Sequence, residues 1–436
     1  MFMDKLKSNK WFIAILIGIA GGISFELAYL KYNYQPAMEA LMGLTSTQAG
    51  ILMSVYGFCA MLLYAPSGII ADKFNNRKLI SISLAVTGLL GFVMATYPPF
   101  YVLVIIQITW AFTTVMFMWS ATIKSVSILG NRDEQGALLG LSEGARGIGC
   151  LVAAFLTLGL FNKFGAENDP ASLRAVLITY GAIMVVLSGL CWIFIPDDKP
   201  AKKENVSKEK TKGFSIADII EVLKLKTTWY VSAIILGVYT VYACLSYTSS
   251  YLIDVFGMTM VMATFIGMIR NQVMRTLSPP IAGLVTAKTS LKSPTKILLI
   301  AAIVNLVALI ILIVAPTKQS LLIPMIGVVL VSAMCVYVSR GMYFATIGEV
   351  NTPVKITGTT IGVASVIGFL PDAFIYIIIG NWQDTLPALE AYRNVWITGA
   401  GATLIAIVAS SLLLKEIKKV KNSEEQEKLN ADMVSV

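Results

Sequence analysis

Apolar residues in this chain recur in blocks of about twenty, separated by short polar or charged breaks. About twenty helical residues, at 1.5 Å each, cross a hydrocarbon core of about 30 Å. Hydrophobic residues make up 56% of the chain and charged residues 14%, and a soluble fold could not bury that much apolar surface. The blocks predict an all-α membrane protein with twelve transmembrane helices at 11–32, 47–70, 79–97, 100–128, 137–160, 173–195, 228–252, 260–283, 295–315, 321–348, 357–379 and 395–415.

The basic residues indicate which side of the membrane each loop occupies. The net charge is +9, and most of the 34 Lys and Arg lie in loops and ends that share one side with the N-terminus. Cytoplasmic segments are enriched in Lys and Arg, so we expect a multi-pass protein of the cytoplasmic (inner) membrane with both termini in the cytoplasm. Topology accounts for the charge, and no nucleic-acid partner is expected.

One long hydrophilic segment divides the spans into two sets of six. It contains Lys-Lys-Glu-Asn and Lys-Glu-Lys-Thr-Lys and has no sustained apolar face. Such a segment is typical of a linker between two bundles. We therefore expect an N-terminal six-helix bundle at 1–196, a cytoplasmic linker at 197–226, a C-terminal six-helix bundle at 227–415 and a cytoplasmic tail at 416–436.

The two halves also share weak sequence features, as expected of a transporter built from two parallel repeats. Each single match is short, but the matches follow the same order along both halves of the chain. The matching positions are Gly68 with Asp72-Lys73 and Gly283 with Ala287-Lys288, Gly136 with Gly140 and Gly358 with Gly362, and Lys124 and Arg340.

The loop between the second and third spans reads Gly68-Ile-Ile-Ala-Asp72-Lys73-Phe-Asn-Asn-Arg77-Lys78. It resembles the signature that the major facilitator superfamily carries at this place, where it helps to hold the outward-open state through charge contacts between the halves. The glycine would let two helices approach closely. The resemblance implies the major facilitator fold and a gating role for Gly68, Asp72, Lys73, Arg77, Lys78 and Arg146. The other interpretation is that these charges only set topology.

Several charged residues lie inside the predicted spans, where each costs roughly 2.5–3.5 kcal/mol unless it faces protein or water. The bases outnumber the acids, so we expect a positively charged interior that selects a small anionic substrate. The bases are Lys31, Lys124, Arg146, Arg270, Arg275 and Arg340, and the acids are Glu26, Glu143 and Asp372.

The two arginines of the eighth span are five positions apart, or about 140° around a regular helix. They cannot both face one site, so one of them is expected to have a structural partner. Arg270 and Asn271 lie nearest the midplane, where superfamily substrates bind between the halves. Asn271 and Arg275 share one stripe of the helix. We keep all three residues as substrate-binding candidates, together with Arg340 of the tenth span and Tyr242 of the seventh.

The first span ends in Tyr29-Leu30-Lys31-Tyr32-Asn33. This resembles the segment of organophosphate:phosphate antiporters in which an Arg two residues before an Asn contacts the substrate phosphate. Trp119 and Lys124, followed by an acidic loop, are similar to another pattern of that family. The resemblance implies substrate roles for Lys31, Tyr32 and Lys124. It departs in the seventh span, where Tyr242 lies near the place of the family's second phosphate-binding Arg, so a carboxylate, sulfonate or sugar acid is as plausible as a phosphate.

Glu143 and Arg146 share one face of the fifth span at an i, i+3 spacing. They either neutralise each other or take part in transport. Four glycines in the same span, Gly140, Gly144, Gly147 and Gly149, are expected to allow tight helix contact. Drug-antiporter branches of the superfamily carry a Gly-Pro motif here, and this span lacks the proline, which favours another substrate class.

The chain contains no His, so a residue that titrates near neutral pH must be a carboxylate. Glu26, Glu143 and Asp372 are the candidates for proton coupling. Their alternative role is to form ion pairs with Arg or Lys across helices.

Together these patterns predict a secondary transporter that moves a small organic anion by alternating access. The substrate is expected to be a sugar phosphate, a sugar acid or another carboxylate, with symport, antiport and proton coupling left open. No zinc-ligand spacing, Gly-x-Ser-x-Gly elbow or phosphate-cradling glycine loop is present, so we expect no enzyme activity, cofactor or metal. The alternative is a drug or cation exporter of the same superfamily, which a negatively charged cavity would indicate. We expect a monomer in the lipid bilayer.

Overall fold

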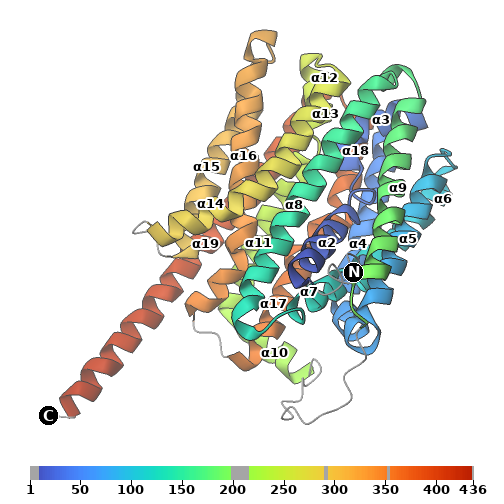
Figure 1. Cartoon of the computed structure of the whole chain (residues 1–436). Coiled ribbons are helices and arrows are strands. Elements are labelled where there is room, and N and C mark those ends of the chain that lie inside the picture. The colour runs from blue at the N-terminus through green and yellow to red at the C-terminus, as the bar shows by residue number, and fades with distance from the viewer. Residues whose placement is uncertain (1–8, 198–215, 289–292, 351–353, 435–436) are drawn as a thin grey trace. The chain divides into compact units, whose positions relative to one another are not determined.

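The computed structural model describes residues 9–197, 216–288, 293–350 and 354–434 (Figure 1). Every regular element among them is helical, as expected of a chain that must satisfy its backbone hydrogen bonds inside lipid. The elements of the first half are α2 (Lys10–Ile23), α3 (Lys31–Met42), α4 (Ser46–Lys73), α5 (Asn76–Met94), α6 (Phe100–Ala111), η1 (Phe112–Trp119), α7 (Ser120–Ser127), α8 (Arg132–Lys163), η2 (Ala166–Asn168) and α9 (Ala171–Phe194).

The second half begins after the hydrophilic segment and ends in a long helix that includes the basic tail. Its elements are α10 (Ile216–Lys224), α11 (Lys226–Leu245), α12 (Thr248–Phe256), α13 (Met260–Met268), η3 (Ile269–Val273), α14 (Met274–Lys288), α15 (Pro294–Val314), η4 (Gln319–Leu321), α16 (Leu322–Met342), η5 (Tyr343–Val350), α17 (Val354–Gly368), η6 (Leu370–Ala373), α18 (Ile375–Thr385) and α19 (Ala388–Val434).

Within the described residues, nine helical stretches are long and apolar enough to cross a membrane, and Lys10–Ile23 and Ile356–Gly368 are shorter apolar helices. The nine correspond to nine of the twelve predicted spans. The first and eleventh spans fall below this length because each is interrupted, by turns over 24–30 and by the 3₁₀ turn η6. The eighth span, which contains the π-helix η3 with Arg270, is not among the nine.

The end of the predicted linker differs from the expectation. Residues 216–224 form α10, whose Val222 is fully buried, so an apolar contact does exist in this segment. The short helix was missed because Ile-Ile and Val-Leu lie beside a long charged run. Residues 198–215 of the predicted linker lie outside the described part of the chain.

The chain forms two compact units. Unit 1 comprises 1–208, 246–276 and 372–392, and unit 2 comprises 209–245, 277–371 and 393–436. Unit 1 therefore contains the six spans of the first half together with α12, α13, η3 and α18 from the second half. The predicted boundaries of the two bundles follow the sequence and stay a prediction.

Glycines bring α4 and α18 into direct backbone contact within unit 1. A Cβ atom built on Gly50 would lie 2.2 Å from the Tyr376 carbonyl oxygen, and one on Gly380 would lie 2.4 Å from the Ser46 carbonyl oxygen. Near the start of the same contact, a Cβ on Gly57 would lie 2.8 Å from the Asp372 carbonyl oxygen. Small residues permit this approach, which contributes much of the packing between transmembrane helices.

A chain of polar side chains joins the ends of α3, α12, α18 and α19 in unit 1. Gln35 donates hydrogen bonds to Glu39 (2.7 Å) and to the Gln383 oxygen (3.0 Å). Gln383 donates to the Tyr392 hydroxyl (2.8 Å), which donates in turn to Asp254 (2.5 Å). Two carboxylates are thereby held at the two ends of one hydrogen-bonded chain.

Asp384 caps the first turn of α4. Its carboxylate oxygens accept hydrogen bonds from the backbone N–H groups of Ser46 (2.9 Å) and Thr47 (2.8 Å). Burial acts to raise the pKa of the Asp384 carboxyl, but hydrogen bonds from Thr47, Ser46 and Thr45 outweigh it and hold the pKa below its ordinary value. An ionised carboxylate at this place also interacts favourably with the helix dipole.

We predict that Gly50→Ala destabilises the protein by about 1–3 kcal/mol, because the added methyl group overlaps the Tyr376 carbonyl and the backbones must separate. Thermal unfolding of the purified protein in detergent measures this. The matched control is Gly159→Ala in α8, where a Cβ meets nothing within 4 Å; helix propensity should leave its midpoint equal or slightly higher. Equal midpoints for the two variants would contradict the close contact.

Candidate functional site

Lys31 is a buried cation enclosed by tyrosine rings in unit 1. It begins α3, and only 4% of it is exposed. Its Nζ lies 3.6 Å from the centre of the Tyr247 ring and 5.1 Å from that of Tyr376. Among the described residues, Nζ has no hydrogen-bond partner and no carboxylate at ion-pair distance. The described residues thus supply π faces to this charge but no carboxylate in direct contact with it.

The tyrosines around Lys31 are linked to one another and to Asp372. The Tyr32 and Tyr376 hydroxyls lie 2.6 Å apart, and Tyr376 donates to the Asp372 carboxylate at 3.1 Å. Tyr247 donates to the backbone carbonyl of Tyr376 at 3.0 Å. Asp372 is positioned by η6, where Pro371 interrupts the predicted eleventh span. Lys31, Tyr32 and Asp372 were predicted as site residues, and the structure brings them together.

The Arg270 side chain contacts the same region by donating a hydrogen bond to a backbone carbonyl. Its Nη2 donates to the Tyr32 carbonyl oxygen at 3.0 Å, and Nη1 lies 3.5 Å from the Thr248 hydroxyl. In a regular helix the Tyr32 carbonyl would accept from the residue four positions later, but that residue is Pro36, which has no N–H. The guanidinium takes the place of the missing donor.

Arg270 and Asn271 lie in η3, a π-helix, and both are buried. A π-helix has a wider turn than an α-helix, so the 140° separation expected for Arg270 and Arg275 does not apply here. The two arginines nevertheless have different surroundings, and Arg275 has the structural partner that was expected for one of them.

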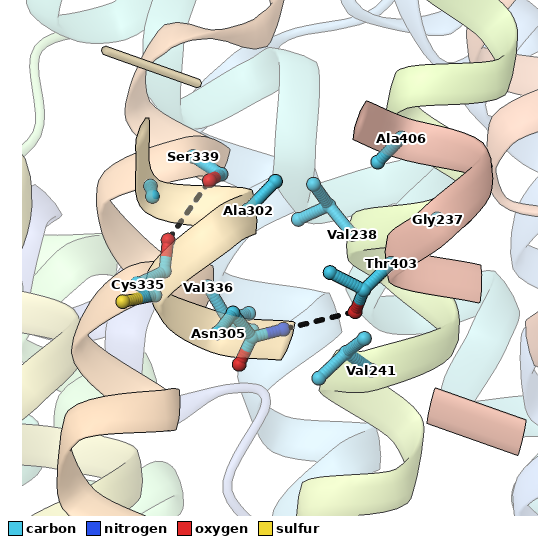
Figure 2. Close-up of a pocket in the computed structure, with 11 residues that line it drawn as sticks. Gly237, Val238, Val241, Ala302, Asn305, Cys335, Val336, Ser339, Thr403 and Ala406 are labelled. Carbon is cyan, nitrogen blue, oxygen red and sulfur yellow. Dashed lines mark hydrogen bonds between the residues drawn. The ribbon is translucent and has the colours of Figure 1, made fainter. Parts of the chain in front are cut away.

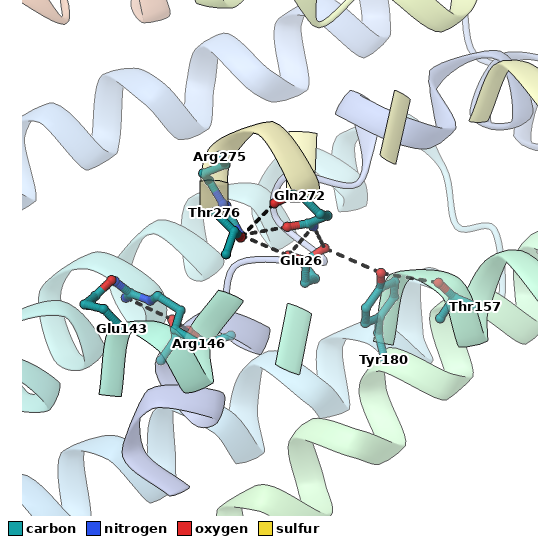
Figure 3. A network of polar contacts seen from close by, with 10 residues as sticks. Glu26, Glu143, Arg146, Thr157, Tyr180, Gln272, Arg275 and Thr276 are labelled. Atoms are coloured by element: carbon teal, nitrogen blue, oxygen red, sulfur yellow. Dashed lines mark hydrogen bonds and ion pairs between the residues drawn. The ribbon is translucent and has the colours of Figure 1, made fainter. Parts of the chain in front are cut away.

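That partner is Glu26, at the centre of the network in Figure 3. Arg275 donates to the Gln272 oxygen at 2.8 Å, and the Gln272 amide donates to both Glu26 oxygens at 2.9 and 3.0 Å. The closest Arg275 nitrogen lies 4.0 Å from a Glu26 oxygen. On the other side of Glu26, the Tyr180 hydroxyl lies 3.5 Å away. Glu26 is thus a buried carboxylate with a cation and neutral donors around it.

Two further cations of the predicted set have carboxylate partners. Lys124 lies 2.9 Å from Asp72 and also donates to the Ala71 carbonyl, while Arg146 lies 3.0 Å from Glu143. The Asp72 and Glu143 side chains are 74% and 65% exposed, so each pair is worth about 0–1 kcal/mol. The structure shows Glu143 and Arg146 in the mutual pair that was one of their two alternatives.

Other members of the predicted gating set are more scattered. Arg77 pairs with Asp197 at 2.9 Å, and Lys73 and Lys78 are exposed. The expectation that Gly68 allows a close helix approach is wrong, because a Cβ there meets nothing within 4 Å.

The four glycines of the predicted fifth span also behave differently from one another. Gly147 and Gly149 make close contacts, with Thr276 and Ile19, as expected. A Cβ on Gly140 or Gly144 meets nothing within 4 Å, so for these two the expected tight contact is wrong. Spacing alone could not identify which of the four glycines face a neighbouring helix.

Arg340 occupies a second aromatic environment, in unit 2. Its guanidinium lies 4.1 Å from the centre of the Tyr242 ring, 5.0 Å from that of Tyr239 and 5.8 Å from that of Tyr337. Nη2 donates to the Tyr239 hydroxyl at 3.2 Å. Tyr242, a predicted site residue, therefore contacts a cation of its own unit.

Unit 2 also contains a small cavity between α11, α15, α16 and α19 (Figure 2). Its walls are mainly small apolar side chains. The Asn305 side chain lines the cavity, donates a hydrogen bond to the Thr403 hydroxyl at 3.1 Å and accepts one from the Ser332 hydroxyl at 2.6 Å. Its polar groups are satisfied by one another, which indicates a packing role.

Sequence reasoning missed Gln272 and Tyr376 as site residues. Pro36 was the available signal for Arg270, because a proline in a helix predicts an unpaired carbonyl four residues earlier. No local pattern connects Tyr247 or Tyr376 to Lys31.

An all-helical membrane fold with buried, aromatic-enclosed cations defines a polytopic transporter. The profile of the Major Facilitator Superfamily matches residues 11–334, and the chain belongs to this superfamily. Its fold has twelve transmembrane helices in two six-helix bundles, as predicted. Membership of the organophosphate:phosphate antiporter branch stays a prediction.

Solved structures and relatives agree with this assignment. The structure is similar to an inward-facing bacterial homologue of the lysosomal transporter Spinster (TM-score 0.71, 13% identity, 96% of this chain and 98% of that one) and to a mutant form of the nucleoside transporter NupG (0.70, 15%, 93% and 100%). In Escherichia coli K12, the inner membrane protein YqcE is 44% identical (95% of this chain, 97% of the relative) and YihN is 30% identical (95% and 98%).

We predict that Arg275→Gln destabilises the protein more than Glu26→Gln does. The first change leaves a carboxylate that is 8% exposed without its cation, whereas the second leaves a guanidinium that is 37% exposed. Thermal unfolding in detergent should show the larger fall for Arg275→Gln, and the double variant should recover part of it. Strictly additive losses would contradict the pairing.

Proposed function

We propose that this transporter moves a small organic anion across the inner membrane by alternating access, and that Lys31 binds the anion. The single observation that carries the proposal is the Lys31 ammonium, which is 4% exposed, has no described hydrogen-bond partner and points at the Tyr247 ring. The inner-membrane location is supported by the names of YqcE and YihN and by the positive-inside distribution of charge.

The free energy of burying the Lys31 ammonium favours binding of an anion that the described residues do not supply. Removing an ammonium from water costs several kcal/mol, whereas a cation–π contact returns about 0.5–2 kcal/mol. The contacts with the two tyrosines therefore offset only part of the free energy that burying the Lys31 ammonium costs. A bound carboxylate or phosphate would offset the remaining cost by supplying the opposite charge at short range.

Fewer cations lack a nearby carboxylate than the sequence suggested. Lys124, Arg146 and Arg275 are each close to a carboxylate, so they add little net positive charge. Lys31 has no carboxylate at ion-pair distance among the described residues, and the Arg270 guanidinium lies beside the carbonyl of the neighbouring residue, Tyr32. The proposed preference for an anion depends on Lys31.

The neighbouring hydroxyl groups indicate the rest of the substrate. Tyr32, Tyr376 and Asp372 form a linked set of donors and acceptors beside Lys31. Such groups suit a ligand that carries hydroxyls as well as an anionic head, and tyrosine rings pack well on a sugar face. We therefore favour a sugar acid or sugar phosphate over a simple inorganic anion.

Proton coupling, if present, must use a carboxylate. Glu26 contacts Arg275 through Gln272, and Asp372 contacts the tyrosines around Lys31. We propose Asp372 as the residue that links protonation to substrate binding, because it shares hydrogen bonds with the substrate site. Glu26 is the second candidate, acting through its arginine.

We predict that purified protein is stabilised against heat by at least one compound in a panel of sugar phosphates, sugar acids, dicarboxylates and inorganic anions. Lys31→Gln should abolish that stabilisation and reduce uptake of the same compound into proteoliposomes at least tenfold, because the counter-charge for the anion is lost. The matched control is Lys163→Gln, which changes an exposed lysine of α8 and should leave binding and uptake unchanged.

Two outcomes would contradict the anion proposal. One is that Lys31→Gln binds and transports the anion as the unmodified protein does. The other is that cationic drugs stabilise the protein while no anion does, which would favour the exporter alternative.

We predict that Asp372→Asn removes the stimulation of uptake by an imposed pH gradient while exchange without a gradient continues. The carboxamide can still accept a hydrogen bond from Tyr376 but cannot bind a proton. Glu26→Gln tests the second candidate in the same assay, and Glu167→Gln, an exposed change in η2, is the control. Stimulation equal to that of the unmodified protein in both test variants would refute coupling through these residues.

A further inference from the structure

Arg340 is held by aromatic residues on two facing helices of unit 2. Tyr239 and Tyr242 are three positions apart on α11, and Tyr337 and Arg340 are three positions apart on α16, so each helix presents an i, i+3 pair. Phe369 packs on Tyr239 with ring centres 4.2 Å apart. The guanidinium is therefore fixed in position by its surroundings.

The charge of Arg340 has no internal counter-charge. No carboxylate of the described residues lies within ion-pair distance of it, and its Nη1 atom is buried without a hydrogen-bond partner. Tyrosine hydroxyls and rings are neutral, so they orient the guanidinium without cancelling its charge.

The two sequence halves differ at the positions that correspond to Arg340 and to a carboxylate partner for it. Lys124, the first-half counterpart of Arg340, is paired with Asp72 at 2.9 Å. The second-half counterpart of Asp72 is Ala287. At these corresponding sequence positions the first half thus has both members of an ion pair, while the second half has a cation and an alanine.

We propose that Arg340, with Tyr239 and Tyr242, forms an anion-binding site in unit 2 that takes a carboxylate-bearing small molecule. The rings pack against the guanidinium, and Nη1 is a buried donor without a hydrogen-bond partner among the described residues, so the guanidinium edge is the part that a ligand would contact. An anion with two coplanar oxygens matches such an edge. The site does not depend on Lys31, which belongs to unit 1.

The test measures benzoate binding to the purified full-length Lys31→Gln variant by isothermal titration calorimetry. Removing Lys31 disables the anion site of the proposed function, and the Arg340 variants in this background then show whether the remaining binding depends on Arg340. Benzoate supplies a planar carboxylate and an aromatic ring, and benzamide is its neutral control. We expect benzoate to bind, benzamide not to bind, and a further Arg340→Gln change to weaken benzoate binding at least tenfold.

Arg340→Lys in the same background keeps the positive charge and the contact with tyrosine faces, so it remains folded if Arg340→Gln does not. It loses the two-nitrogen edge, and we expect benzoate affinity to fall about tenfold as well. Benzoate binding that is absent in the Lys31→Gln background, unchanged by both Arg340 variants, or matched by benzamide would overturn the proposal.

Discussion

A charge inside a membrane-spanning bundle needs an opposite charge, and the way each cation of this chain obtains one organises the structure. Lys124, Arg146 and Arg275 obtain it from carboxylates of their own unit. Lys31 and Arg340 are surrounded by tyrosines, with no carboxylate of the described residues at ion-pair distance. Desolvation makes the second arrangement costly unless another molecule completes it. The first arrangement is consistent with a structural role, and the second is the basis on which we propose binding sites.

Interrupted helices make this arrangement possible. Turns precede Lys31, a π-helix contains Arg270, and the 3₁₀ turn η6 contains Asp372. Each interruption places a polar side chain or a spare carbonyl inside the bundle, where a regular helix would satisfy its own backbone. Pro36 shows the cause most directly, because the carbonyl it leaves unpaired is the one that Arg270 binds. Irregular backbone is tolerated at membrane depth where protein surrounds it.

The sequence was sufficient for the fold and for the inventory of charged residues. Apolar blocks of fixed length predict spans, and a charged residue within a block is visible without coordinates. It was insufficient for partners, because contacts of Lys31 with Tyr247 and Tyr376 join segments far apart in the chain. Spacing around a regular helix also failed at η3, where the turn is wider. The excess of cations over acids was too coarse a measure of cavity charge, since Lys124, Arg146 and Arg275 are neutralised locally.

The contacts between α4, α3 and α18 have a kinetic consequence. Segments from the two sequence halves meet there through Gln35 with Gln383 and through Ser46 and Thr47 with Asp384. The Gln35–Gln383 hydrogen bond is worth about 0.5–1.5 kcal/mol net and each bond to the Asp384 carboxylate about 1.5–3 kcal/mol, because water can replace either partner. A transport cycle that parts these segments can exchange them for water one after another. The backbones that touch at Gly50 and Gly380 leave no room for water, so the same step must also separate the two helices themselves.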